Sequence, residues 1–179
     1  MNKKEFFIGI VVITFICALS GYLLSYIYKI TMPRIEKIKK IKENKINKEI
    51  FPEGVNFIEK EMDGIKYISV LNLNDEEIGK IFEVKTLGYG GYIYLKVGID
   101  KDMKIKGIKI KEHSETPGLG SKITENKFLD QFTGKTKDDI YLKKDNPNGK
   151  IDAVTGATIS SRSVVESVRK LLEKIKEEK

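Results

Sequence analysis

The stretch Asp152-Ala-Val-Thr-Gly-Ala-Thr-Ile-Ser-Ser161 stands directly before the strongest amphipathic pattern in the polar part of the chain. Its small residues and hydroxyl groups are typical of a helix N-terminus. The apolar residues that follow recur at helical spacing: Val164, Val165, Val168, Leu171, Leu172 and Ile175. This spacing predicts a C-terminal helix that buries one face in a core.

The hydroxyl residues of this stretch allow two interpretations. Thr155, Thr158, Ser160 and Ser161 are possible caps of the predicted helix. Free backbone N–H groups and the helix dipole also make such an end a site for an anion such as phosphate. Arg162 can add a charge-assisted contact to that anion. A capped helix without a ligand explains the same residues, so both interpretations stay open at this point.

Short β-like runs separated by turns precede the helix, from residue 51 onward. The predicted strands are Ile65–Leu71, Ile78–Thr86, Tyr92–Ile99 and Lys104–Lys111. In the last two, apolar and polar residues alternate, as in antiparallel strands with one face in water. A short helix is expected from about Ser121 to Phe132. The prediction is an α+β domain over residues 51–179, with a mixed, mostly antiparallel sheet and a C-terminal helix.

An apolar segment lies near the N-terminus. Residues 6–28 form a 23-residue run without a charge, long enough to cross a ~30 Å hydrocarbon core at ~1.5 Å per residue. Three tyrosines at its far end suit an interfacial belt: Tyr22, Tyr26 and Tyr28. The run predicts a single transmembrane helix after a tail of residues 1–5. A cleaved signal peptide is the alternative, with a cleavage site at residues 18–20, but the apolar run continues beyond it.

A basic segment follows, over residues 29–50, with isoleucines at helical spacing. Eight Lys or Arg residues and three Glu lie there, in a chain of formal net charge +7. We predict an amphipathic juxtamembrane stalk that lies on the membrane, packs on a partner or serves as a linker. Pro33 is expected to stop or kink the preceding helix. Because the basic excess is concentrated here and no known motif occurs, nucleic acid is excluded as a partner. Basic residues flank the apolar run on both sides, so charge leaves its orientation open.

Cysteine and histidine are nearly absent. The chain has one cysteine, Cys17, inside the apolar run, and one histidine, His113. An intramolecular disulfide and a Cys-x-x-Cys centre are therefore excluded, and neither a histidine metal site nor a Ser-His-Asp triad is indicated. We predict no metal ligand and no catalytic acid or base.

Two more glycine-bearing loops come before the opening stretch. Gly88-Tyr-Gly-Gly91 lies between two predicted strands and lacks the spacing of a dinucleotide-binding fingerprint. It is either a hairpin turn or a close backbone approach to a flat ligand, with Tyr89 or Tyr92 against a ring. The other loop, His113-Ser-Glu-Thr-Pro-Gly-Leu-Gly120, lacks the spacing of a triphosphate-binding loop.

These stretches together resemble one flavoprotein family. Asp152-x-x-Thr-Gly-Ala-Thr158 is similar to the motif of proteins that carry FMN covalently on the last hydroxyl residue. The loop His113–Gly120 is similar to the loop beside the flavin in the same family. With its N-terminal anchor and the loop Gly88–Gly91, the chain resembles the G subunits of Rnf-type ion-translocating electron-transport complexes. Those proteins are related to the C subunits of the sodium-translocating NADH:quinone reductases.

The resemblance implies a flavin site built from the three loops. Thr158 would carry FMN through a phosphodiester, while Ser160 and Ser161 stay conceivable attachment points. A separate flavin transferase would attach the FMN. The other motif residues that it would recognise are Asp152, Thr155, Gly156 and Ala157. The residues expected to contact FMN are Tyr89, Gly90, Gly91, Glu115, Thr116, Leu119, Gly120 and Arg162.

The resemblance also implies an electron-relay function. The chain would act with other membrane subunits in a complex that links ferredoxin and NAD to sodium or proton movement, with little turnover on its own. Its flavin domain would lie on the extracytoplasmic side of the cell inner membrane, where flavin transferases act. Two alternatives stay open: a stand-alone extracytoplasmic reductase and a membrane-tethered structural module without a cofactor.

Overall fold

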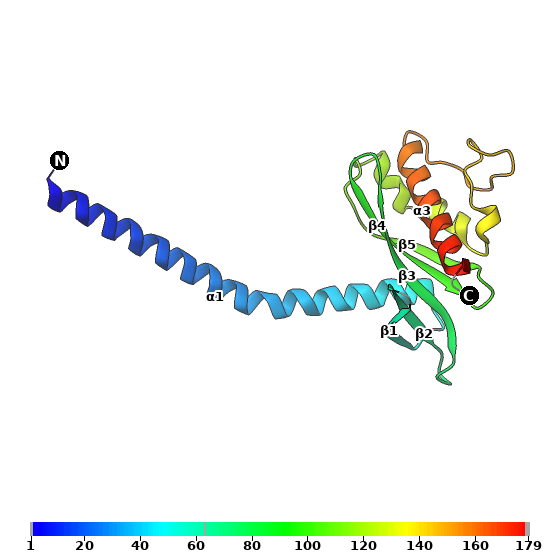
Figure 1. The fold of residues 1–179 in the computed structure, drawn as a ribbon, viewed down its shortest axis with the longest axis horizontal. Coiled ribbons are helices and arrows are strands. Elements are labelled where there is room, and N and C mark those ends of the chain that lie inside the picture. Colours follow the sequence, from blue (N-terminus) through cyan, green and yellow to red (C-terminus); the bar gives the residue numbers. More distant parts are fainter. Residues whose placement is uncertain (1, 63, 178–179) are drawn as a thin grey trace. The chain divides into compact units, whose positions relative to one another are not determined.

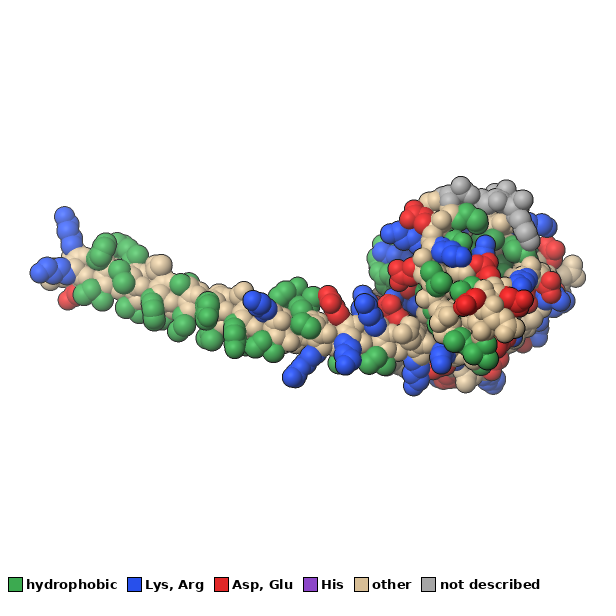
Figure 2. Space-filling model, turned by 90° about the horizontal axis from the view of Figure 1, so that it is seen from below, with side chains coloured by type: hydrophobic (Ala, Val, Ile, Leu, Met, Phe, Trp, Pro, Cys, Tyr) green, Lys and Arg blue, Asp and Glu red, His purple; other side chains and the backbone are tan. Residues whose placement is uncertain are grey.

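The first part of the chain is a single long helix. The computed structural model describes residues 2–62 and 64–177, and the chain divides into two compact units, residues 1–43 and 44–179. Helix α1 (Lys3–Ile50) is long and apolar enough, near the N-terminus, to cross a membrane. Figure 2 shows its apolar side chains exposed along the first unit. The helix continues through Pro33, so the alternative in which this proline stops it is wrong.

The second unit is built on a five-stranded antiparallel sheet with strand order β1-β2-β3-β4-β5. The strands are β1 (Asn56–Met62), β2 (Ile65–Leu71), β3 (Glu77–Leu87), β4 (Tyr92–Asp100) and β5 (Ile105–His113). The four predicted strands are present to within two residues at each end, and β1 was not predicted. Among the described residues, the one parallel pairing is the isolated bridge between Leu142 and Ile151. The predicted α+β fold is therefore confirmed.

Short helical segments and a long C-terminal helix complete the unit. They are η1 (Gly120–Thr124), α2 (Asn126–Leu129), η2 (Asp130–Phe132), η3 (Lys137–Asp139) and α3 (Thr158–Glu177). The helix predicted over residues 121–132 is thus divided into three short pieces. Helix α3 packs against one face of the sheet (Figure 1), and its predicted apolar stripe joins strand residues such as Ile93 and Val97 in the main core.

The opposite face of the sheet is covered in part by the end of α1. Ile50 and Phe51 form a second core cluster with Val70 and Ile81. Because Asn47 and Ile50 are buried, the compact unit begins within α1, before the predicted domain start at residue 51.

Lys96 on β4 corrects the expectation that this strand has one face in water. Its side chain is fully buried, with 0% exposed. The Lys96 ammonium donates to Asn47 Oδ1 at 3.0 Å and lies 3.4 Å from Glu83 Oε1. A buried ammonium requires such partners, so α1 is joined to the sheet by a polar contact as well as by apolar packing.

Replacing Asn47 with alanine should destabilise the sheet domain. The Lys96 ammonium would lose its buried amide acceptor, and an unmet hydrogen bond of this kind costs about 1–3 kcal/mol. Asn44→Ala, at an exposed position of the same helix, is the matched control. Urea unfolding of the purified chain, followed by circular dichroism, measures the change. Equal midpoints for the two variants would contradict this account of Lys96.

Candidate functional site

The three glycine-bearing loops meet around one open cavity of about 340 Å³. Tyr89 comes from the turn between β3 and β4, whereas Glu115 and Leu119 come from the loop after β5. The start of α3 contributes Thr158. The complete lining is Tyr89, Glu115, Thr116, Leu119, Gly120, Gly156, Ala157, Thr158, Ile159 and Ser160. The predicted convergence of the three loops is therefore present in the structure.

Thr158 is the first residue of α3. The turn before it closes through a hydrogen bond from Ala157 N to Val154 O (2.9 Å), and the helix begins with one from Ser161 N to Ala157 O (2.9 Å). Thr158 is half-buried and lines the cavity. Its hydroxyl group therefore lies at the positive end of the helix dipole, which favours an anion such as phosphate.

The two neighbouring serines are both buried and their hydroxyl groups are occupied. Ser160 Oγ donates to Glu115 Oε2 at 2.8 Å. Ser161 Oγ donates to Ala157 O at 2.9 Å and accepts from Val154 N at 3.0 Å. These hydroxyl groups hold the local fold together, whereas no hydrogen bond within the described residues engages the Thr158 side chain.

Glu115 joins the three loops. Its side chain is only 5% exposed, and Oε1 accepts hydrogen bonds from Tyr89 N at 2.9 Å and Gly90 N at 3.3 Å. Oε2 accepts from Ser160 Oγ. The backbone N–H of Glu115 itself donates to His113 Nδ1 at 3.2 Å. One carboxylate therefore ties the β3–β4 turn and α3 to the loop that follows β5.

Two glycines make room for this carboxylate. A Cβ atom at Gly88 would overlap Glu115 Oε1, and one at Gly120 would overlap Glu115 Oε2. Any larger residue at either position would displace the carboxylate from its backbone donors. The two loops therefore need glycine because of close packing.

Exposed apolar side chains surround the cavity. Tyr89, Leu119 and Ile159 all line it and all are more than half exposed. Ile159 is a lining residue that we did not predict, whereas Ser160 was considered only as a helix cap and as an alternative attachment point. Ile159 had a signal in the sequence, because it is an apolar residue outside the helical series that starts at Val164.

Other predicted residues lie beside the cavity. Gly90 contributes its N–H to Glu115, and Gly91 completes the turn by accepting from Gly88 N. Asp152 and Thr155 line a neighbouring cavity of about 530 Å³. Lys143 Nζ donates to Asp152 Oδ2 at 2.6 Å.

The side chain of Arg162 forms a salt bridge with Asp145. Its Nε and Nη2 donate to the two carboxylate oxygens of Asp145, each at 2.7 Å. The hydrogen bonds from Arg162 lower the pKa of the Asp145 carboxyl, and the same pair raises the pKa of Arg162. Arg162 does not belong to the cavity lining, and its contact with phosphate stays a prediction.

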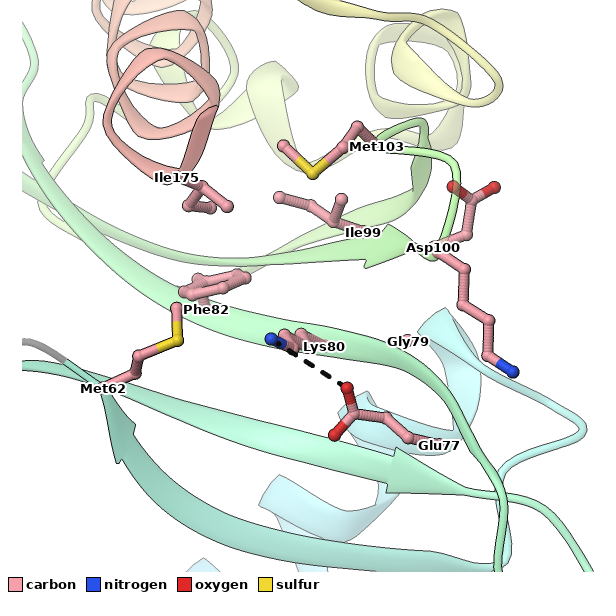
Figure 3. Close-up of a pocket in the computed structure, with 10 residues that line it drawn as sticks. Met62, Glu77, Gly79, Lys80, Phe82, Ile99, Asp100, Met103 and Ile175 are labelled. Atoms are coloured by element: carbon pink, nitrogen blue, oxygen red, sulfur yellow. Dashed lines mark ion pairs between the residues drawn. The ribbon is translucent and has the colours of Figure 1, made fainter. Parts of the chain in front are cut away.

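A cavity of about 550 Å³ lies elsewhere in the domain. Figure 3 shows Phe82, Ile99, Met103 and Ile175 facing it, with an ion pair between Lys80 and Glu77 at 3.9 Å. Ile175 is on the same helix as Thr158 but roughly 25 Å further along at 1.5 Å per residue. None of the predicted site residues lines this cavity.

The first cavity has the features that FMN needs. Its volume lies within the ~300–1,000 Å³ typical of ligand pockets, its exposed apolar walls suit a flat ring, and a helix N-terminus suits a phosphate. Among the described residues there is no group of three or more His, Cys, Asp or Glu placed to hold a metal ion. The residues present therefore fit FMN better than a metal centre.

This chain is similar to FMN-binding domains and to subunits of ion-translocating oxidoreductase complexes. Residues 88–173 match the family model described as FMN-binding domain. The chain is 32% identical to the G subunit of the proton-translocating ferredoxin:NAD(+) oxidoreductase complex of Clostridium ljungdahlii, over 91% of this chain and 88% of that protein. It is also 32% identical to the G subunit of the ion-translocating oxidoreductase complex of Methanosarcina acetivorans, over 93% of each chain. Among solved structures, the C subunit of the Na(+)-translocating NADH-quinone reductase from Parabacteroides distasonis is 24% identical, with a TM-score of 0.49 over 62% of each chain.

Proposed function

The chain belongs to the family of G subunits of ion-translocating oxidoreductase complexes, and on this premise we propose that it carries FMN on Thr158 through a phosphodiester bond. It is a membrane-anchored flavoprotein subunit that transfers electrons within such a complex. The covalent attachment, the attachment residue, the electron donor and acceptor, and the side of the membrane are the parts that we propose.

The observation that carries the attachment site is the contrast among three hydroxyl groups. Thr158 lines the cavity and is half-buried at the start of α3, whereas Ser160 and Ser161 are buried and hydrogen-bonded. A hydroxyl group must be reachable to attack phosphorus, so Thr158 is the best acceptor of the three. The small residues Gly156 and Ala157 leave space for a second enzyme to approach.

The attachment reaction needs FAD and a flavin transferase. Thr158 Oγ1 attacks the phosphorus on the flavin side of the phosphoanhydride of FAD and loses its proton. The new O–P bond replaces the bond to AMP, which leaves, so the chain gains FMN minus water. The motif residues Asp152, Thr155, Gly156 and Ala157 are the part of the chain that we expect the transferase to contact.

The residues of the site hold and orient the cofactor. When bound, FMN supplies one- and two-electron redox chemistry. Leu119 and Tyr89 provide apolar walls that exclude water from the ring, and the N-terminus of α3 stabilises the phosphate. Glu115 keeps the loops in place. We assign no side chain as a catalytic acid or base.

We propose that the complex passes electrons between ferredoxin and NAD, as the name of the Clostridium ljungdahlii relative indicates for that protein. The flavin domain is proposed to lie on the extracytoplasmic side, where a transferase for exported flavoproteins can reach it. Its partners would be the other membrane subunits of the complex.

The test is in-gel flavin fluorescence of the full chain in membranes, with and without an active flavin transferase. We expect a fluorescent band that survives denaturation only when the transferase is present. In a separate measurement on the intact complex before denaturation, adding reduced ferredoxin should lower the flavin fluorescence, because reduced flavin does not emit. A flavin that dissociates on denaturation would contradict the covalent bond, and one that ferredoxin never reduces would contradict the relay.

A further inference from the structure

Exposed apolar side chains of the sheet domain are concentrated at one end. Among its described residues, the exposed large hydrophobic ones are Val55, Ile58, Leu73, Leu87, Tyr89, Tyr92, Tyr94, Leu119 and Ile159. Six of these nine lie in or next to the loops that form the flavin site. A flat ligand in the cavity accounts for the three that line it, Tyr89, Leu119 and Ile159. It does not account for Leu87, Tyr92 and Tyr94.

The other three residues form one surface. Leu87 pairs with Tyr92 across β3 and β4, and Lys85 pairs with Tyr94. Side chains of directly opposed residues share a face of the sheet, as do residues two apart on one strand. Leu87 is 63% exposed, Tyr92 51% and Tyr94 37%. We call Lys85, Leu87, Tyr92 and Tyr94 the tyrosine patch.

The tyrosine patch lies on the face of the sheet away from α3. The alternating residues between its members point to α3, because Thr86 Oγ1 donates to Ser163 O and Ile93 is in the core beneath that helix. The end of α1 covers Lys96 on this face but leaves Tyr94 and Tyr92 exposed. The patch is therefore an uncovered part of this sheet face, next to the exposed Glu112 that pairs with Tyr94 on β5.

The ammonium group of Lys85 has no acidic partner among the described residues. Its Nζ lies 3.8 Å from the centre of the Tyr92 ring and 5.4 Å from that of Tyr94. Within residues 2–62 and 64–177, no carboxylate lies within ion-pair distance of Lys85. Glu83, the nearest acid along β3, already pairs with Lys96 and Lys111. The patch thus offers one free positive charge between two exposed tyrosine rings.

We propose that the tyrosine patch is the docking surface for another protein subunit of the complex, one that presents a carboxylate to Lys85 and apolar groups to the tyrosine rings. Tyrosine is enriched at the centres of protein interfaces, and a desolvated cation is favoured there only when the partner supplies the opposite charge. The patch adjoins the turn whose Tyr89 lines the flavin cavity. A partner protein bound there would lie beside the flavin, as electron exchange requires. The inference rests on the proposed role as an electron relay within a complex.

Site-specific crosslinking in the assembled complex tests this surface. Tyr94 is replaced by the photoreactive residue p-benzoylphenylalanine in the full chain, and Leu73, which is 85% exposed in the β2–β3 turn, is replaced as the matched control. After illumination of membranes that contain the whole complex, we expect an adduct between position 94 and one other protein of the complex. Adding Lys85→Glu should lower its yield by roughly fivefold or more, since charge reversal repels an acidic partner, while Lys85→Arg should preserve it.

Several outcomes would overturn the proposal. An adduct with lipid would assign the patch to the membrane surface, and no adduct or one with an unrelated protein would leave it without a docking role in the complex. Equal adduct yields at positions 94 and 73 would show that crosslinking is not specific to the tyrosine patch. Flavin fluorescence of the same samples keeps the two proposals separate: an adduct within the complex on a chain without flavin would count against the flavin proposal and not against docking.

Discussion

Thr158→Ala should abolish covalent flavin while leaving the domain folded. The substitution removes the hydroxyl group that we propose as the acceptor of FMN, so in-gel fluorescence and added mass should both fall to background. The fold should persist because loss of one hydroxyl at a helix start costs about 1 kcal/mol. Thr158 makes no side-chain hydrogen bond within the described residues, so the loss of unfolding free energy should be no larger than this.

Thr155→Ala is the matched control for this variant. Thr155 belongs to the same motif but is exposed and lines the neighbouring cavity. Because we expect the transferase to contact Thr155, this variant should load flavin more slowly than the wild type, but it should still carry covalent flavin on Thr158. Covalent flavin on Thr158→Ala at the wild-type level would show that the attachment residue is another one.

Glu115→Ala should have the larger effect on the domain itself. It removes the acceptor of the N–H groups of Tyr89 and Gly90 and of the Ser160 hydroxyl. Ser160 is the buried donor residue of the three, and a buried donor left without a partner costs about 1–3 kcal/mol, so the free energy of unfolding should fall by about 1–3 kcal/mol. The flavin cavity should lose its shape with it, and flavin loading should fall at least about tenfold. Urea unfolding and in-gel fluorescence measure the two effects.

Glu115→Gln separates the hydrogen bonds of Glu115 from its charge. Gln can still accept from the backbone N–H groups through its carbonyl oxygen, so it should recover most of the stability. Glu112→Ala, at an exposed position three residues earlier, should change neither property. If Glu115→Ala were as stable as Glu112→Ala, the carboxylate would not be the link among the three loops.

Strand prediction succeeded where one face of the sheet is buried along the whole strand. The alternation of Ile93, Leu95, Val97 and Ile99 placed β4 correctly, because these side chains all enter the core beneath α3. Strand β1 was missed because it is an edge strand with mostly exposed side chains. Edge strands of this kind carry charged residues and have no clear alternation.

The site was predictable in outline because its parts are local. Each loop carries its own glycines, and Thr158 directly precedes the helical pattern. The role of Glu115 was not predictable, because its partners Tyr89, Gly90 and Ser160 lie 26, 25 and 45 residues away along the chain. The resemblance implies that Glu115 contacts the flavin, and this contact stays a prediction. The structure adds that Glu115 is buried and that its carboxylate joins the three loops.

The burial of Lys96 also depends on residues far away in the sequence and was not predictable for the same reason. Its position in the alternation predicts exposure to water, and only the packing of Asn47 and Ile50 from α1 against the sheet buries it. The pattern of β4 contains no sign of this contact, because it depends on a helix about fifty residues earlier in the chain.

The intact mass of the full chain, produced together with an active flavin transferase, tests the central claim most directly. We predict a gain equal to FMN minus water, which peptide mapping should place on the peptide that contains Thr158. An unmodified mass, when the same transferase modifies a control flavoprotein in the same cells, would contradict covalent attachment. The start of α3 would then be a capped helix beside a cavity that binds flavin non-covalently at most.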